Sequence, residues 1–222
     1  MKKVIFYLPV SKKIGFGHLV RCSVFESFFN KKNFKCILVS NDLSNLNLIN
    51  NKIFAFCKKL KWKNQSHNSN KIIDLYYKLK CDYIVIDDKK VGLTFQKKLF
   101  LNKVKWLQFQ NSQDIRFYSN QLLYQNSAKH LKNKIQNQIV YDSKKYVILR
   151  KEFYKRRLKY GKSIFLCCGG SSKLSFYKTI LQILNELNCK KSIIILVNDN
   201  KIFTDISRLK KNKFKKFKYK NL

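Results

Sequence analysis

The sequence predicts an α/β protein of two Rossmann-like lobes, and two patterns support this prediction. Short apolar segments alternate with amphipathic helical segments, as expected for a parallel sheet that helices cover on both faces. Glycine is scarce, yet two pairs, Gly15 with Gly17 and Gly169 with Gly170, each lie between an apolar segment and an amphipathic one. Glycine at such a turn lets backbone N–H groups approach a ligand, and the helix that follows presents its positive dipole end. The repeated arrangement indicates two similar lobes.

Hydrophobic periodicity predicts the individual elements in chain order. Uninterrupted apolar runs predict strands at Val4–Leu8, Phe34–Ser40, Tyr83–Asp87, Val104–Phe109, Ile164–Cys168 and Ser192–Val197, with a further candidate at Ile53–Phe56. Apolar residues three and four positions apart predict helices at His18–Asn30, Lys71–Leu79, Phe95–Leu101 and Leu174–Leu187. We expect residues 1–150 to form the N-terminal lobe and residues 151–222 to form a shortened C-terminal lobe.

Positive charge dominates the composition, with 48 Lys and Arg against 12 Asp and Glu and a formal net charge of +36. Taken alone, this charge favours a nucleic acid or another anionic partner. However, the abundance of Lys, Asn, Ile and Phe is also what an A/T-rich gene produces, and the lysines are spread along the chain. We therefore expect weak, non-specific attraction to anions. The basic tail Lys210–Lys220 interleaves aromatic residues with lysines and is interpreted as a strand or a frayed end rather than a stacking surface for bases.

The cysteines and histidines form no recognisable metal motif. None of the seven cysteines belongs to a CxxC pair, and most lie in apolar runs, where a free thiol behaves as a small apolar side chain. This pattern predicts a reduced, cytoplasmic protein without a metal or another cofactor. No apolar run reaches the roughly 20 residues that span a bilayer.

The segment Ile14–Arg21, which reads Ile-Gly-Phe-Gly-His-Leu-Val-Arg, is the most informative part of the chain. It places His18 at the start of a helix and Arg21 three residues later, on much the same helix face. An imidazole beside a fixed cation and the backbone N–H groups around Gly15 and Gly17 suits the activation of water next to a phosphorylated substrate. A helix-capping histidine with a solvated arginine would give the same pattern.

Two other segments are candidate binding sites. Gly169, Gly170 and Ser171 form a second phosphate-loop candidate, for which an ordinary strand-to-helix turn is an equal alternative. Asp87 ends a predicted strand and Asp88 follows it. Carboxylates at that end of a strand face the ligand crevice of open α/β sheets, although a solvated pair in a loop is equally compatible with the pattern.

These motifs resemble those of the UDP-sugar hydrolases of pseudaminic acid biosynthesis, a family of two Rossmann-like lobes (GT-B-like) related to the peptidoglycan glycosyltransferase. Ile14–Arg21 is similar to the family's IGxGHxxR loop, Tyr146–Phe153 to its YxLLRxEF inter-lobe segment, and Phe165–Ser171 to its second-lobe GG loop. Asp82–Asp87 and Leu122–Asn126 resemble less specific segments of the family and occur in the expected order.

The resemblance implies an activity and roles for particular residues. The implied reaction is hydrolysis of UDP-2,4-diacetamido-2,4,6-trideoxy-altrose to UDP and the free sugar, by attack of water on the anomeric carbon with inversion and without a metal. It implies that His18 is the general base and that Gly17 lies near the substrate. It further implies that Gly169, Gly170 and Ser171 cradle the diphosphate.

The sequence departs from the family pattern at several acidic positions. Tyr7–Val10 lacks the aspartate that usually precedes the glycine loop, Gln110 and Asn111 stand in place of an acidic pair, and Ser172 replaces an aspartate after the second loop. The tyrosine usually found after Asp87 is also absent. From the resemblance we expect the second lobe to lack about half of the family's residues, in a part that holds much of the family's uridine recognition. The sequence therefore predicts a retained fold with either an active or a degenerate site.

Three alternatives to hydrolysis stay open on the sequence. The same fold could transfer the sugar to an acceptor in place of water. The positive charge could instead serve a nucleic-acid-binding module. Finally, an inactive remnant with an unfinished sheet edge would be prone to associate with itself or with a partner.

Overall fold

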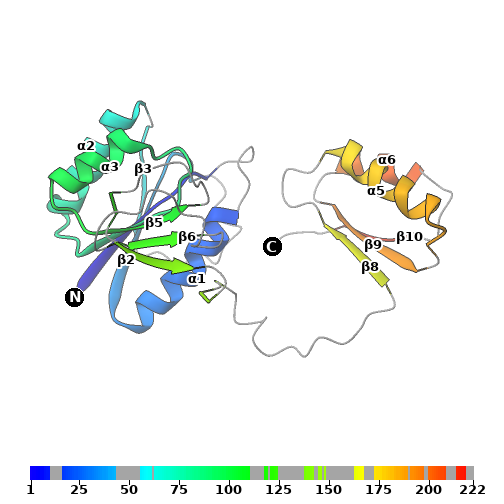
Figure 1. Ribbon diagram of the computed structural model, residues 1–222, viewed down its shortest axis with the longest axis horizontal. Coiled ribbons are helices and arrows are strands. Elements are labelled where there is room, and N and C mark those ends of the chain that lie inside the picture. Colours follow the sequence, from blue (N-terminus) through cyan, green and yellow to red (C-terminus); the bar gives the residue numbers. More distant parts are fainter. Residues whose placement is uncertain are drawn as a thin grey trace. The chain divides into compact units, whose positions relative to one another are not determined.

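The computed structural model contains two compact units, one holding the elements from β1 to β7 and the other those from β8 to β10 (Figure 1). It describes residues 1–10, 17–43, 56–61, 63–110, 118–119, 121–124, 138–142, 145–146, 148, 163–167, 173–189, 191–197, 200–208 and 214–218. Each unit has its own parallel sheet and its own hydrophobic core.

The first unit is built on a parallel sheet of seven strands in the order β3-β2-β1-β4-β5-β6-β7. The strands are β1 (Lys2–Tyr7), β2 (Phe34–Ser40), β3 (Phe56–Lys59), β4 (Tyr83–Ile86), β5 (Trp106–Gln110), β6 (Gln121–Tyr124) and β7 (Ile139–Asp142). β1 pairs with both β2 and β4. The chain therefore builds outward from β1 in one direction and later from β4 in the other, so the strand order reverses between these two neighbours. Ligands of open α/β sheets bind at such a reversal, beyond the carboxyl ends of the strands.

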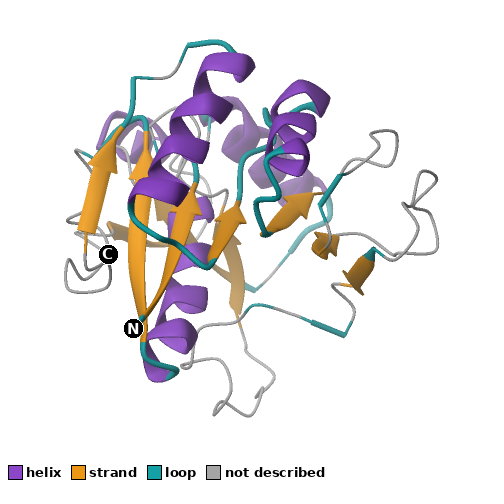
Figure 2. Cartoon of the chain, turned by 90° about the vertical axis from the view of Figure 1, so that its left-hand side faces the viewer, coloured by secondary structure: helices purple, strands orange, loops and turns teal. Residues whose placement is uncertain are grey.

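Helices cover both faces of this sheet (Figure 2). On one face, α1 (Gly17–Lys31) packs through Leu19 and Cys22 against strand residues such as Phe6. On the other face, α2 (Gln65–Lys78) and α3 (Leu93–Leu101) enclose a core that includes the fully buried Trp106. Because the helices connect parallel strands, each begins at the carboxyl ends of the strands and ends near the amino ends. We call the end of the sheet where its strands finish the carboxyl edge, and the end where its strands begin the amino edge.

Four helices of the described chain are followed by a residue with positive φ: Asn33 (59°), Lys80 (50°), Lys103 (51°) and Asn188 (47°). Glycine is the usual residue at this position because it adopts the left-handed conformation without strain. In a chain with six glycines, asparagine and lysine fill these positions.

The second unit has a parallel sheet in the order β10-β9-β8, formed by Ser163–Cys167 (β8), Ser192–Val197 (β9) and Phe214–Lys218 (β10). Helices α5 (Leu174–Glu186) and α6 (Asn200–Arg208) share one core with the sheet, in which Tyr177 and Ile206 pack with Ile195. Along β8, residues alternate between half-buried and exposed, and Phe165 is 62% exposed. One face of this sheet is therefore apolar core, whereas Phe165 lies on the other.

The predicted strands and helices are present, with shifts at their ends. β5 begins at Trp106 rather than Val104 because the Val104 N–H still closes the end of α3, at 3.0 Å from the Leu99 carbonyl oxygen. β6, β7 and α6 were not predicted. The two strands are four residues long and become strands through pairing with their neighbours. The candidate strand Ile53–Phe56 lies outside the described residues except for Phe56, which begins β3. The tail forms strand β10, in agreement with the strand interpretation.

Candidate functional site

The first turn of α1 and the end of β4 meet at the carboxyl edge, where the strand order reverses. Gly17 is the first residue of α1, and a Cβ atom at this position would have no atom within 4 Å. His18 and Arg21 follow Gly17 near the start of the helix, and both side chains contact Asp87 beside the sheet. Asp87 directly follows β4, and its backbone N–H donates to the Tyr7 carbonyl oxygen of β1 at 2.9 Å. This bond fixes the carboxylate opposite the start of the helix.

The Asp87 carboxylate holds both cationic side chains of the helix. His18 Nδ1 lies 2.8 Å from Asp87 Oδ1. Arg21 binds the carboxylate with two donors, Nε to Oδ2 at 2.8 Å and Nη2 to Oδ1 at 2.6 Å. The side chain of Asp87 is 3% exposed, against 11% for His18 and 26% for Arg21. The acid is therefore buried beneath its two partners, in the paired arrangement that a buried charge requires.

Burial by itself raises the pKa of the Asp87 carboxyl, but the hydrogen bonds from His18 and Arg21 and their positive charges lower it below its ordinary value. Asp87 is thus ionised, and a carboxylate only accepts hydrogen bonds. The proton in the 2.8 Å contact must then belong to His18 Nδ1. In the neutral ring this leaves Nε2 unprotonated, as in an imidazole that an aspartate orients for general-base work.

Three neighbours surround this cluster. The guanidinium of Arg21 lies over the ring of Phe109, 5.1 Å from its centroid. This contact helps to hold the orientation of the guanidinium. The Cys22 thiol lies 3.8 Å from Asp87 Oδ2, and burial raises the pKa of that thiol, so it stays protonated and unreactive. Asp88 is also buried, and burial raises the pKa of its carboxyl despite a hydrogen bond from the Lys90 N–H. The two adjacent aspartates therefore have pKa values shifted in opposite directions.

The structure brings together three of the residues singled out from the sequence, His18, Arg21 and Asp87, with Gly17 at the helix start beside them. Gly15, Gly169, Gly170 and Ser171 lie outside the described residues. The contact of Arg21 with the Phe109 ring was not predicted, because Phe109 has the pattern of the last apolar residue of a strand. The direct bond between Arg21 and Asp87 was likewise not anticipated.

The described part of the chain lacks two features. It contains no cluster of three or more His, Cys, Asp or Glu residues that could hold a metal ion. Within the same residues, no helix combines the length and the apolar character needed to cross a membrane.

Comparisons by sequence give no relative for this chain. A scan against protein-family models found no match, and a search of the curated proteins found none either.

Comparison with solved structures does reveal related folds. A glycosyltransferase from Rickettsia africae aligns with 99% of this chain and 69% of its own at 14% identity and a TM-score of 0.58. MurG from Acinetobacter baumannii aligns with 99% of this chain and 66% of its own at 10% identity and a TM-score of 0.62. The UDP-GlcNAc 2-epimerase from Neisseria meningitidis, solved with UDP-GlcNAc, aligns with 99% of this chain and 73% of its own at 12% identity and a TM-score of 0.55.

Identities this low establish the fold and nothing finer. The chain spans about two thirds to three quarters of the length of these three proteins. The α/β, GT-B-like fold class predicted from the sequence is confirmed, whereas membership of one particular hydrolase family stays a prediction.

Proposed function

We propose that this protein hydrolyses a nucleotide sugar, with His18 as the general base. The observation that carries the proposal is the bond between His18 Nδ1 and the buried, ionised Asp87 at the carboxyl edge. An aspartate that holds Nδ1 protonated directs the free electron pair of Nε2 away from itself, toward the ligand crevice that this fold class uses. A histidine that only capped the helix would not need a buried carboxylate as its partner.

In the proposed reaction, His18 Nε2 accepts a proton from water as the water oxygen bonds to the anomeric carbon. The bond between that carbon and the UDP oxygen breaks, and UDP leaves with the electron pair. The imidazolium formed is stabilised by the Asp87 carboxylate at 2.8 Å. Arg21 keeps that carboxylate ionised and adds positive potential at the helix start, where the helix dipole also favours an anionic substrate.

The substrate assignment rests on two supports outside the His18 cluster. Solved structures of this fold include enzymes that act on UDP sugars, among them an epimerase with UDP-GlcNAc bound. The sequence motifs resemble those of the hydrolases that act on UDP-2,4-diacetamido-2,4,6-trideoxy-altrose. On this resemblance, we propose that Gly15 and Gly17 lie beside the sugar phosphate, that Gly169, Gly170 and Ser171 bind the diphosphate, and that the reaction serves cytoplasmic synthesis of a surface-glycan sugar.

The first test is a calorimetric titration with UDP, followed by an assay of UDP release from the diacetamido sugar nucleotide. We expect saturable UDP binding that survives added salt. His18→Asn should lower the turnover about 10²- to 10⁴-fold, the usual contribution of a general base. His67→Asn, in a half-buried histidine on α2, is the matched control and should leave turnover unchanged. Equal turnover in His18→Asn and the parent protein would refute the base assignment.

Glycosyl transfer is the second candidate, favoured by the glycosyltransferases among the structures of this fold. The same imidazole would then take its proton from an acceptor hydroxyl. Stimulation of UDP release by a sugar or lipid acceptor, with label from the donor appearing on it, would replace hydrolysis with transfer as the assigned reaction.

A further inference from the structure

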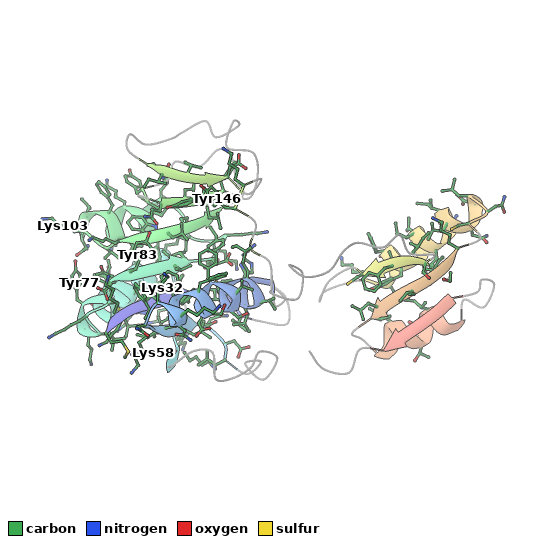
Figure 3. The ribbon with its side chains drawn as sticks, turned by 90° about the horizontal axis from the view of Figure 1, so that it is seen from below. Lys32, Lys58, Tyr77, Tyr83, Lys103 and Tyr146 are labelled. Atoms are coloured by element: carbon green, nitrogen blue, oxygen red, sulfur yellow. The ribbon has the colours of Figure 1, made fainter. Side chains whose placement is uncertain are left out.

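The amino edge of the first unit concentrates positive charge that the proposed reaction does not use. Four described stretches meet there, residues 1–3, 31–35, 78–83 and 101–105, as the start of β1 and the turns that lead from α1, α2 and α3 into the next strands. They carry nine lysines, eight of them exposed, and Asp82 is the single acidic residue in these stretches. Lys103 is labelled at one end of the first unit in Figure 3.

Base composition alone does not account for this concentration, because the two edges of the same sheet differ. The carboxyl edge has four aspartates among its described residues, namely Asp42, Asp87, Asp88 and Asp142. The carboxyl edge also carries exposed lysines, among them Lys61, Lys63 and Lys90, but its aspartates offset part of their charge, so the less compensated positive charge lies at the amino edge.

The ends of the helices use up only a part of this charge. The C-termini of α1, α2 and α3 point to the amino edge, and each carries a partial charge of roughly −0.5. Lys3 serves such an end directly, since its Nζ donates to the Leu79 carbonyl oxygen after α2 at 2.8 Å. The Asp82 carboxylate accepts the Lys3 backbone N–H at 2.7 Å. Three helix ends and one aspartate together offset roughly two to three of the nine lysine charges.

An open hollow of about 590 Å³ lies within the same edge. The first residues of β1, β2, β4 and β6 line it. Its walls include the aromatic rings of Phe29, Phe34 and Tyr83, and Lys2, Lys105 and Asp82 lie beside them. The Lys2 ammonium lies over the Phe34 ring, 5.7 Å from its centroid. All three rings are half-buried, so they are held in place by the core that they cover. Rigid aromatic walls next to lysines are the combination that binds an unpaired base and its phosphates.

We propose that the amino edge of the first unit binds single-stranded nucleic acid, with bases entering the aromatic hollow and phosphates lying on the surrounding lysines. The helices meet this edge end-on, and no described helix lies flat along it with an apolar face outward, which is how an amphipathic helix binds a membrane surface. The proposal is independent of the nucleotide-sugar reaction, because His18 lies at the opposite edge.

The test compares two triple variants with the same change in net charge. One variant carries Lys2→Glu, Lys32→Glu and Lys105→Glu at the amino edge. The control carries Lys61→Glu, Lys63→Glu and Lys178→Glu at exposed positions elsewhere. Lys80 and Lys103 are left intact so that the residues with positive φ after α2 and α3 are unchanged in both variants. Binding of a fluorescein-labelled uridylate dodecamer is measured by anisotropy at several salt concentrations.

At 150 mM salt, charges farther than about 8 Å from the strand are largely screened. We therefore expect the edge variant to bind at least about tenfold more weakly, with a salt slope reduced by about 2, and the control to change less than about twofold. Equal weakening in the two triples would overturn the proposal, because binding would then follow net charge alone. Tighter binding to vesicles of anionic lipid than to the RNA would also overturn it.

A single substitution tests the aromatic part. Phe34→Leu should weaken binding about fivefold with the salt slope unchanged, since stacking carries no counterion release. Phe165→Leu, at a 62% exposed position of β8, is its control. Circular dichroism establishes that each variant is folded. UDP should not compete with the RNA, so failure of UDP binding would count against the proposed function and not against this surface.

Discussion

The two edges of the seven-stranded sheet differ in whether their charged side chains are buried and paired or exposed. At the carboxyl edge, Asp87 is buried and bound to both His18 and Arg21. At the amino edge, eight exposed lysines surround one aspartate. The comparison teaches that position in the fold, more than residue type, decides what a charge can do. A buried pair orients groups for chemistry, whereas exposed like charges create a field that attracts an anion.

Helix α1 joins the two edges and contains one charge that fits neither pattern. Glu26 lies two turns beyond His18 and is 1% exposed, and its side-chain partner is the amide of Asn30. Burial raises the pKa of Glu26 to about 7, and the Asn30 hydrogen bond lowers it only in part. Asp87 and Glu26 are thus two buried acids whose pKa values move in opposite directions because Asp87 alone has cationic partners.

The largest expected effect comes from breaking the carboxyl-edge cluster with Asp87→Asn. Both carboxylate oxygens accept from Arg21, so the NH2 group of the amide would face an Arg21 donor on either side, and the negative charge that stabilises the His18 imidazolium would be lost. We expect kcat for nucleotide-sugar hydrolysis to fall about 10²- to 10⁴-fold. The affinity for UDP, measured by calorimetry, should change by less than about threefold. Asp74→Asn, an exposed position on α2, should change neither quantity. Turnover within about threefold of the parent would show that Asp87 does not orient His18.

The sequence predicted the edge that the cluster occupies but not the contacts inside it. The glycine loop put His18 at a helix start, and the apolar run Tyr83–Asp87 put an aspartate at a strand end, so a parallel fold had to bring both to the carboxyl edge. The contact of Arg21 with Asp87 depends on how α1 is rotated against the sheet, and its even mixture of apolar and polar residues gives no strong signal for that rotation.

The fold was likewise predictable where the local signal was strong. β2 was predicted at its observed bounds because a seven-residue run that is mostly apolar precedes a turn. β6 and β7 could not be predicted, since Gln121–Tyr124 and Ile139–Asp142 acquire their conformation from pairing with strands distant in sequence. The charge separation between the two edges could not be predicted either, because it arises only when the turns of the first unit are gathered on one side.

The second expected effect concerns Glu26, the buried acid without a cationic partner. Between about pH 4.5 and 7, the folded protein keeps a proton on Glu26 that the unfolded chain releases, so stability falls as the pH rises through this range and the loss is complete above pH 7. The pKa shift corresponds to about 3 kcal/mol. We expect Glu26→Gln to be more stable than the parent by that order at pH 8 and similar to it at pH 4.

Urea unfolding followed by tryptophan fluorescence measures this difference in the first unit, since Trp62 and Trp106 both belong to it. Asp74→Asn, at an exposed position of α2 in the same unit, is the control and should give no difference between pH 4 and pH 8. A stability difference for Glu26→Gln that stays constant with pH would mean that Glu26 does not titrate in this range.

The smallest expected effect separates the two roles of a single lysine at the amino edge. Lys103 follows α3 and has a φ of 51°, a conformation that glycine adopts without strain. Lys103→Gly should therefore stabilise the first unit by about 0.5–1 kcal/mol in the same urea assay. The substitution also removes one positive charge from the edge, and we expect the affinity for the uridylate dodecamer to fall about twofold. Asn33→Gly makes the same backbone change in the first unit, where φ is 59°, without removing a charge, and should raise stability while leaving the affinity unchanged. Opposite signs for stability and affinity in Lys103→Gly would mean that the lysine is kept at this position for its charge, at the expense of the fold. If both the stability and the affinity for the dodecamer rose, the charge of Lys103 would contribute nothing to binding. The difference between the two edges would then be supported only by the buried cluster of His18, Arg21 and Asp87.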